Sequence, residues 1–288
     1  KPRFTFDEDV FKTLSKTTVG ALDRKIKHGE NLSYEEAFCG MCYVLGATNT
    51  LVLNTLKVNF EKAYGARFTK EKAIAIASAF LNLMATKEAL KSLTYEEVAG
   101  MSAAAMLDPV HTFTVPEIIE TCGMGGDKGF YKNGERYKSI NASTLSAIVL
   151  SATGLPAVKH GSYGNTSAVG STEMIESFGA KTDCSDAAEV MRIWRKTNFS
   201  FFDAHWCKTI HDLSHLLMME TVNHIVGPMT PPICKDTVIN KLMGVNEKVT
   251  PETIARAYAL LHMQKVQKVG GVLVICGLDA ASKIVTDE

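Results

Sequence analysis

The sequence predicts an α/β protein in which a small helical domain precedes a larger α/β domain with a mostly parallel central sheet. Helix start signals and apolar residues at helical spacing fill the first hundred positions. After residue 110, short β-like runs alternate with helical runs, the pattern of a parallel sheet covered by helices. We therefore expect a mainly helical domain over residues 1–110 and an α/β domain over residues 111–288, with part of the helical layer completed later in the chain.

Capping residues mark two helices of the N-terminal domain. Ser33 is a predicted N-cap and is followed by two glutamates in the first turn. Thr94 precedes Glu97 by three residues, which is the spacing of a capping box, and that helix should run to about residue 106. Residues 69–83 are apolar at helical spacing and predict another helix, whereas residues 50–64 are less regular and are interpreted as an insertion.

The second domain alternates predicted strands with predicted helices. The strands are short β-like runs: residues 118–122, 156–158, 199–202 and 272–276. The helices are longer periodic runs: residues 145–153, 173–178, 213–225 and 251–267. Gly154 and Gly179 should end the first two helices, and Pro251 suits the first turn of the last one.

Charge and composition exclude several classes of protein. The 288 residues are 46% hydrophobic and 22% charged, which is ordinary for a globular chain. Because 31 Lys and Arg residues balance 31 Asp and Glu residues, a broad nucleic-acid surface has no support. The longest apolar run, residues 269–281, is too short to span a membrane and is broken by glycines. We expect no nucleic acid, no membrane and a cytoplasmic location.

The seven cysteines are odd in number and scattered. Cys39 and Cys42 form one C-x-x-C pair, but no second pair follows it. Because this pair lies in an apolar, helix-like run, we favour buried free thiols over a zinc or redox site. A reducing compartment is the simplest setting for such thiols.

A glycine-rich segment after the first strand of the second domain is the most informative motif. Gly123, Gly125 and Gly126 allow a backbone to approach a ligand and to turn its N–H groups toward an anion. Asp127 would hold a ribose hydroxyl or a metal-bound water. A glycine-rich turn without a ligand is an equally good interpretation of this segment alone.

Two further polar segments follow. Asn141, Ser143 and Thr144 stand directly ahead of an apolar helix, where they either cap the helix or offer hydrogen bonds to a phosphate. Lys159 ends a strand and leads into a Gly/Ser/Thr loop, so it is either a phosphate ligand or a surface lysine. Because loops at the carboxyl ends of parallel strands meet in one crevice, the three segments together favour a phosphate site.

The order of a Gly-Gly-Asp loop, Asn-x-Ser-Thr and Lys-His-Gly resembles the anthranilate phosphoribosyltransferase family, which shares its fold with pyrimidine nucleoside phosphorylases. Other segments strengthen the resemblance, including Leu-Ser-Tyr-Glu-Glu-Ala at residues 32–37 and Val-Gly-Pro-Met-Thr at residues 226–230. The resemblance implies that 5-phosphoribose moves from phosphoribosyl pyrophosphate to an amine or aromatic acceptor, with Mg²⁺ as cofactor.

The resemblance also implies the site residues. The catalytic residues would be Lys159, His160 and Asp127, with Ser143 and Asp279 at Mg²⁺. The substrate-binding residues would be the following: Gly123, Gly125, Gly126, Asp127, Asn141, Ser143, Thr144, Lys159, Gly161, Ser162, Asn165, Ser167, His205 and His215. The loop over residues 161–167 would close over the donor.

Several departures from the family pattern limit these expectations. The family continues Lys-His-Gly with Asn-Arg-Ser, whereas Ser162, Tyr163 and Gly164 stand here. The link over residues 130–139 is longer and basic, and we prefer a solvated loop to a flap over phosphate. The family's acceptor region supplies an arginine for the anthranilate carboxylate, but residues 209–224 contain no arginine. We therefore expect an acceptor other than anthranilate.

Histidines cluster in this acceptor region. His211 and His215 are four residues apart and share a helical face, with His205 and His224 nearby in sequence. Lining the acceptor pocket and lying on a helix surface are equally good interpretations, and a zinc site is a weaker one. The aromatic rings of residues 202 and 206 would stack on an acceptor or, more often, belong to a core.

The expected partners follow from the same resemblance. Family members commonly dimerise through the helical domain, so a homodimer is the default. They also continue past residue 288 with strands that complete the sheet, which implies a trimmed chain or a second chain that supplies the rest. A partner-dependent, non-catalytic subunit and a nucleoside phosphorylase remain the alternative functions.

Overall fold

The computed structural model describes residues 17–64, 67–107, 113–125, 130–132, 135–137, 140–164, 169–184, 187–207, 217 and 221–286. The chain divides into two compact units. The first comprises Lys1–Val110 with Cys207–Thr230, and the second comprises His111–Trp206 with Pro231–Glu288. The first unit thus includes a segment that returns to it from beyond the boundary near residue 110.

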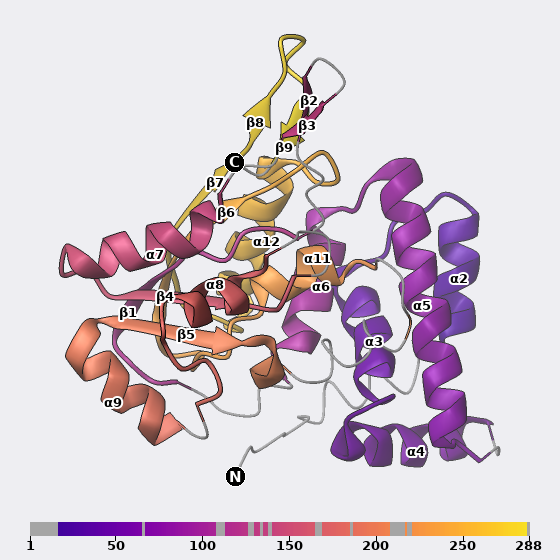
Figure 1. Cartoon of the computed structure of the whole chain (residues 1–288). Helices are drawn as coiled ribbons and strands as arrows, with labels where there is room; N and C mark the ends of the chain where they lie inside the picture. The colour runs from indigo at the N-terminus through magenta and orange to yellow at the C-terminus, as the bar shows by residue number, and fades with distance from the viewer. Residues whose placement is uncertain are drawn as a thin grey trace. The chain divides into compact units, whose positions relative to one another are not determined.

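The first unit is helical over its described residues (Figure 1). Its helices are α2 (Val19–Lys27), α3 (Tyr34–Leu45), α4 (Thr50–Tyr64), α5 (Lys70–Lys91), α6 (Tyr95–Ala105) and α11 (Asn223–Val226), followed by the 3₁₀ turn η2 (Gly227–Met229). Helix α3 packs against α5 and α6 and is almost entirely buried. Both predicted caps are confirmed, since Ser33 and Thr94 each form a capping box with a glutamate three residues on.

Helix α4 differs from the sequence expectation. Residues 50–64 form one continuous helix despite their less regular apolar pattern, and their interpretation as an insertion stays a prediction. The Asn49 side chain accepts a hydrogen bond from the Val52 N–H (3.2 Å) and so satisfies a free donor at the helix start. Leu56 is buried and lies so close to Gly46 that a Cβ there would be 2.4 Å from it. Packing against the end of α3 therefore compensates for a weak apolar pattern.

By length and composition alone, α5 is apolar enough to cross a membrane. A core helix of a soluble protein passes the same test. Within the helical unit, Phe80 and Met84 of α5 are fully buried. Lys87 on the same helix is also buried and donates to the Glu97 carboxylate of α6 at 2.5 Å. Packing inside this unit buries part of α5, including Ala73, Ala77 and Leu81.

The second unit holds a five-stranded sheet in the order β5-β4-β1-β6-β7. Its strands are β1 (Glu117–Glu120), β4 (Ala157–Gly161), β5 (Phe199–Asp203), β6 (Val238–Gly244) and β7 (Val269–Ile275). Every neighbouring pair is parallel. The predicted α/β class with a mostly parallel central sheet is confirmed.

Helices pack against this sheet (Figure 1). They are α7 (Ala142–Ala152), α8 (Ser171–Ser177), α9 (Ala187–Thr197) and α12 (Pro251–Met263). Gly154 and Gly179 follow α7 and α8 with φ angles of +89° and +76°, as predicted for glycine at helix ends. Of the helix predicted over residues 213–225, most lies outside the described residues, and α11 covers only its last part.

Aromatic residues fill the core between α9 and the sheet. The rings of Phe202 and Trp206 meet edge to face at 5.1 Å, and Phe113 contacts both Phe202 and Trp194 in the same way. Phe202 is fully buried, and Trp206 is 6% exposed. These rings are therefore core residues in the described structure, which decides between the two interpretations of residues 202 and 206.

Two features of the second unit were not expected. The sequence does not predict β6, although it lies between β1 and β7. The described parts of residues 130–139 form an antiparallel ribbon of β2 (Phe130–Lys132) and β3 (Glu135–Tyr137) rather than an irregular loop, and the choice between a solvated segment and a flap over phosphate stays a prediction. The intervening Asn133-Gly134 dipeptide is a hairpin signal in the sequence. A second ribbon joins β8 (Gly277–Leu278) to β9 (Ile284–Thr286).

Candidate active site

The carboxyl ends of β1, β4 and β6 carry a buried ionic cluster. On each of these strands, an apolar core residue is followed two positions later by an ionic one. The ionic residues are Glu120 on β1, His160 on β4 and Lys241 on β6. Side chains two residues apart share a face of the sheet, so one face changes from apolar to ionic toward the carboxyl ends of the strands. The register places Lys241 directly opposite Glu120. This is the edge at which parallel sheets place their ligand sites.

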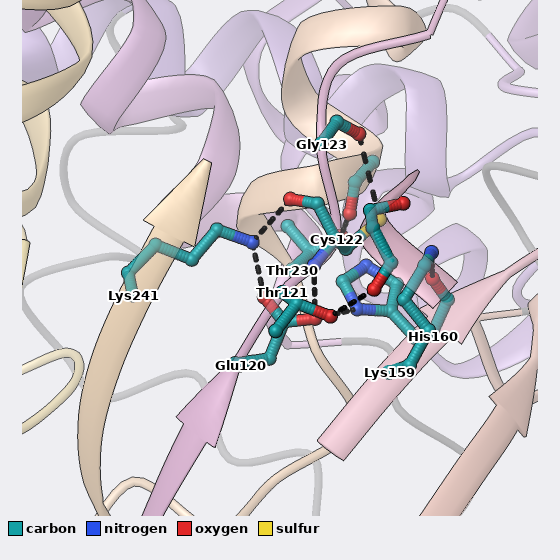
Figure 2. Close-up of polar contacts among 10 residues, drawn as sticks. Glu120, Thr121, Cys122, Gly123, Lys159, His160, Thr230 and Lys241 are labelled. Carbon is teal, nitrogen blue, oxygen red and sulfur yellow. Dashed lines mark hydrogen bonds and ion pairs between the residues drawn. The ribbon is translucent and has the colours of Figure 1, made fainter. Parts of the chain in front are cut away.

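The Glu120 carboxylate connects the members of this cluster (Figure 2). Its Oε1 accepts the Cys122 backbone N–H at 2.9 Å and lies 2.9 Å from His160 Nδ1. Its other oxygen forms an ion pair with Lys241. Lys241 Nζ also donates to the Cys122 carbonyl at 2.7 Å. These contacts hold the start of the glycine-rich segment against the strand ends.

The charges within the cluster shift the pKa values of Glu120, His160 and the adjoining Cys122. Burial alone would raise the pKa of Glu120, but Lys241 and His160 lower it to about 2. Burial alone would lower the pKa of His160, but Cys122 and Glu120 raise it to about 9. Burial alone would also raise the pKa of the Cys122 thiol, but His160 and Lys159 lower it to about 6. At neutral pH the cluster thus contains a thiolate and an imidazolium.

Lys159 and Gly161 flank His160 on β4. Lys159 is 2% exposed, and its Nζ donates to the His160 carbonyl. A Cβ on Gly161 would lie 3.1 Å from that Nζ and 2.7 Å from the Ser171 Cβ. Glycine is therefore needed where the strand approaches both the lysine and the start of α8. The buried position excludes the interpretation of Lys159 as a solvated surface lysine.

The glycine-rich segment is pinned to the end of β6. The Met124 N–H donates to the Gly244 carbonyl at 2.9 Å, and the Asn246 side chain donates to the Gly125 carbonyl at 3.2 Å. The Gly123 carbonyl lies 3.6 Å from Cys122 Sγ. Gly126 and Asp127 lie outside the described residues, so their predicted roles remain predictions.

The N-terminus of α7 comes to the end of β1. Asn141 is the N-cap, and its Oδ1 accepts from the Thr144 N–H (3.4 Å) and the Thr144 hydroxyl (2.8 Å). The Thr121 hydroxyl, directly after β1, donates to the Ser143 carbonyl at 2.8 Å. This bond brings Ser143 and the strand end together, as the loop-convergence argument predicts, although Asn141 and Thr144 also serve as an ordinary cap.

The loop after β4 is held by a carboxylate. Both oxygens of Glu173 accept the Gly164 N–H, at 2.9 and 3.0 Å, and one accepts the Gly170 N–H at 2.9 Å. The Ser162 hydroxyl donates to the carbonyl of the next residue at 3.0 Å. These N–H groups are therefore already bonded to an anion of the chain itself. Asn165 and Ser167 lie outside the described residues.

The remaining predicted site residues are scattered. Asp279 lies in the β8–β9 turn, where its carboxylate accepts the Ala281 and Lys283 N–H groups at 2.9 and 2.8 Å. His205 lies in the 3₁₀ turn η1 (Ala204–Cys207), but its side chain is not described. His211 and His215 lie outside the described residues, as does the zinc-like string between them. His224 Nε2 is 2.8 Å from the Glu88 carboxylate inside the helical unit.

The possible metal ligands among the described residues form two groups that suit different metals. Ser143 offers a hydroxyl oxygen beside a helix N-terminus, and hard oxygen ligands of this kind suit Mg²⁺ that also binds phosphate. The ligand atoms of Glu120, Cys122 and His160 lie within 4.8 Å of one another. A thiolate and an imidazole are poor Mg²⁺ ligands, so this second group does not fit that metal. Cys39 and Cys42 are buried free thiols, as predicted.

Sequence reasoning missed three members of the site: Glu120, Cys122 and Lys241. The available signal was the charge of Glu120 and Lys241 within otherwise apolar strand segments, because charged residues are almost never buried without a partner. The sequence does not predict that the two are partners, since 121 residues separate them.

Comparison with known proteins places the chain in a family. Residues 115–287 match the model described as "Glycosyl transferase family, a/b domain". The chain belongs to this glycosyl transferase family.

Its relatives make the resemblance more specific. Anthranilate phosphoribosyltransferase from Pyrococcus furiosus is 31% identical over 80% of this chain and 66% of its own length. The same enzyme from Pyrococcus abyssi is 32% identical over 79% of this chain and 65% of its own length. The chain thus spans slightly less than two thirds of the length of these relatives. The predicted resemblance to the anthranilate phosphoribosyltransferase family is confirmed.

Solved structures agree in fold. Anthranilate phosphoribosyltransferase from Saccharomyces cerevisiae in complex with PRPP and Mg covers 94% of this chain and 67% of that chain, with a TM-score of 0.65 and 19% identity. The Thermus thermophilus enzyme covers 91% of this chain and 67% of that chain, with a TM-score of 0.56 and 20% identity. At this identity the likeness concerns the fold.

Proposed function

We propose that this chain binds phosphoribosyl pyrophosphate with Mg²⁺ and transfers 5-phosphoribose to an amine or aromatic acceptor. The observation that carries the proposal is the meeting of three elements at one sheet edge. The Thr121–Ser143 hydrogen bond joins the end of β1 to the N-terminus of α7, and β4 adds Lys159 at the same edge. The yeast structural neighbour is described as a complex with PRPP and Mg, which supports the same class of donor.

Phosphoribosyl transfer requires positive charge near the leaving pyrophosphate. Breaking the ribose C1–O bond places positive charge on the sugar and negative charge on the departing pyrophosphate. Lys159 and the N–H groups at the start of α7 would stabilise the pyrophosphate. His160, which Glu120 and Cys122 hold as an imidazolium, adds a second cation beside Lys159. The chain's remaining task is to place the acceptor near C1 and to exclude water.

Mg²⁺ would neutralise phosphate charge when it is bound. The Ser143 hydroxyl is the described donor that fits it, and Asp127 and Asp279 remain proposed contributors. Asp279 already accepts two backbone N–H groups, so its carboxylate would have to serve both the turn and the metal. Gly123, Gly125 and Gly126 would line the donor site.

For the acceptor we propose a compound other than anthranilate. The relatives are named anthranilate phosphoribosyltransferases, but residues 209–224 contain no arginine to pair with a substrate carboxylate. His205 and His215 would line this side of the site. A homodimer and a cytoplasmic location are part of the same proposal.

Calorimetric titration with phosphoribosyl pyrophosphate tests the donor site. Binding should require Mg²⁺ and should be lost in Lys159→Met and weakened in Ser143→Ala. Lys196→Met removes the same charge from an exposed lysine on α9 and should bind like wild type. A folded chain that shows no Mg²⁺-dependent binding would overturn the proposal.

Pyrophosphate release tests the acceptor. A panel should compare anthranilate with aromatic amines that lack the carboxylate and with other amines. We expect turnover with an acceptor other than anthranilate. A clear preference for anthranilate would reject that part of the proposal and leave the donor site intact.

A further inference from the structure

Cys122 occupies an unusual place among the cysteines of this chain. It follows β1 by two residues and begins the glycine-rich segment, and its Sγ lies within 4.8 Å of ligand atoms of His160 and Glu120 (Figure 2). The side chain is 7% exposed. Both backbone polar groups of Cys122 are hydrogen-bonded, since Glu120 accepts from its N–H and Lys241 donates to its carbonyl. The sulfur is thus fixed inside the ionic cluster.

Without a negative charge on the Cys122 sulfur, the side chains around it carry more positive than negative charge. Lys159, Lys241 and His160 are potential cations, whereas Glu120 is the carboxylate that pairs with two of them. A buried excess of positive charge is costly, so a second anion stabilises the cluster. The Cys122 thiolate supplies that anion without any change in the packing.

One polar group beside the cluster lacks a partner. Tyr258 on α12 is 1% exposed, and its hydroxyl has no hydrogen-bond partner within the described residues. Burial raises the pKa of Tyr258 well above its ordinary value, and the negative charges of Glu120 and Cys122 add to this effect. The hydroxyl is therefore a neutral, buried donor that feels the charge of Cys122 and Glu120.

We propose that Cys122 is a peroxide-sensitive thiolate whose oxidation to a sulfenic acid disables the adjoining donor site. In the reaction, the thiolate attacks one oxygen of hydrogen peroxide, and the S–O bond forms as the O–O bond breaks. The sulfur loses two electrons to the peroxide. The departing hydroxide takes a proton from the His160 imidazolium and leaves as water.

Oxidation removes the thiolate charge, and the proton transfer removes the charge of the His160 imidazolium, so the ion pair between these two residues is lost. Oxidation also adds an oxygen atom where Cys122 is packed against the strand ends. The glycine-rich segment begins at this residue, so its position should change. This consequence for donor binding depends on the proposed function, whereas the reactivity of the sulfur does not.

A metal ion is the competing use of Glu120, Cys122 and His160. Their atoms are close enough to coordinate one cation. However, Lys241 already pairs with the Glu120 carboxylate, and its ammonium would repel a divalent ion at the same place. The arrangement therefore favours the ionised thiol over a metal ligand.

Sulfenic acid trapping with dimedone, read by peptide mass spectrometry, tests the proposal. At pH 7 a thiol with a pKa near 6 is about 90% ionised, against a few per cent for an ordinary thiol. Cys122 should therefore react with hydrogen peroxide at least about tenfold faster than Cys184, whose side chain is more exposed but whose pKa is raised by burial. Equal labelling of the two, or faster labelling of Cys184, would overturn the proposal.

The pH dependence of the oxidation rate at Cys122 gives a second test, and it needs no variant. The rate at Cys122 should reach half its plateau near pH 6. The other charged or titratable groups of the site are Glu120, Lys159, Lys241 and Tyr258. The pKa of Glu120 is lowered to about 2 and that of Tyr258 is raised well above its ordinary value, so neither group titrates near pH 6. A rate that continues to rise through pH 8.5 would identify an ordinary thiol and reject the proposal.

Variants and metal analysis complete the test. His160→Gln should slow oxidation of Cys122 by roughly tenfold, whereas His28→Gln, at an exposed position in the helical unit, should not. Stoichiometric zinc that is present in the purified chain and absent from Cys122→Ser would overturn the proposal in favour of a metal site. Oxidation of Cys122 that leaves donor binding unchanged would overturn the proposed switch, whereas a reduced, folded chain that binds no donor would count against the proposed function and leave the reactivity of the sulfur in place.

Discussion

Lys241 on β6 and Glu120 on β1 form an ion pair between directly opposed positions of two parallel strands, and both side chains are fully buried. Glu120 also contacts His160 of β4, so a single carboxylate joins three neighbouring strands. Lys241 binds the carbonyl of Cys122 as well. The pair thus fixes both the sheet and the first residue of the glycine-rich segment.

Removing one partner of this pair should destabilise the second unit strongly. Lys241→Met leaves the Glu120 charge buried with less compensation, and a loss of about 3–5 kcal/mol is typical of such a change. Urea unfolding followed by circular dichroism measures it. The double variant Glu120→Leu with Lys241→Met should recover part of the loss, because no unpaired carboxylate remains. Lys268→Met, which breaks an exposed pair with Asp236 at 3.7 Å, should have little effect.

Protonation of Glu120 at low pH should lower the free energy of unfolding. The pKa of this carboxyl is about 2 in the folded chain, against an ordinary value of 4.5. A group with a depressed folded pKa contributes stability that is present above pH 4.5 and is lost as the pH falls toward 2. Unfolding free energies between pH 5 and pH 2 should therefore decline. Glu120→Gln should show a shallower decline than wild type, and an identical slope would contradict the assignment.

Between pH 6.5 and pH 9, the contributions of Cys122 and His160 to the pH dependence of folding stability should cancel one another. The folded pKa of His160 is raised to about 9 from 6.5, so its contribution is lost as the pH rises through this range. The folded pKa of Cys122 is lowered to about 6 from 9, so its contribution grows over the same range. In effect the thiol passes its proton to the imidazole on folding, and the number of bound protons is unchanged.

Wild type should therefore show a nearly flat stability profile from this pair between pH 6.5 and pH 9. Cys122→Ser removes the compensating thiol, and Glu120 still favours the imidazolium, so stability should fall with rising pH in that variant. Cys184→Ser is the matched control and should keep the wild-type profile. A flat profile in Cys122→Ser would show that the two residues are not coupled.

Gly170 should tolerate no side chain. A Cβ at this position would lie 2.4–2.5 Å from backbone atoms of Gly164, Ser162 and Tyr163, and backbone cannot move aside cheaply. Gly170→Ala should cost about 1–3 kcal/mol in unfolding free energy, as overpacking does. Gly20→Ala places the same methyl group in open space on helix α2 and should be neutral or stabilising by up to about 1 kcal/mol. Equal effects in the two variants would contradict the close approach.

The local features of this chain were predictable from its sequence. The capping boxes at Ser33 and Thr94, the helix ends at Gly154 and Gly179 and the alternation of strands with helices all depend on residues a few positions apart. The ordered donor motifs could be predicted for the same reason, because each loop directly follows its strand.

Other features required the tertiary structure. Strand β6 has an ionic residue at a buried position, which hides its apolar pattern until Glu120 is known to lie opposite. Helix α4 has a weak pattern that becomes stable only against the end of α3. The bonding of loop N–H groups by Glu173 is also invisible in the sequence, because loop geometry decides which donors remain available.

The sequence by itself determined the fold class, the family resemblance and the residues at three strand ends, since these follow from local patterns and their order along the chain. The tertiary structure alone decided which charges are partners. Glu120, Cys122, His160 and Lys241 come from three strand segments, and their ionisation depends on distances that no local pattern encodes. Coulomb energy in a buried site changes steeply with those distances, and for that reason the chemistry of this site appears only in the folded chain.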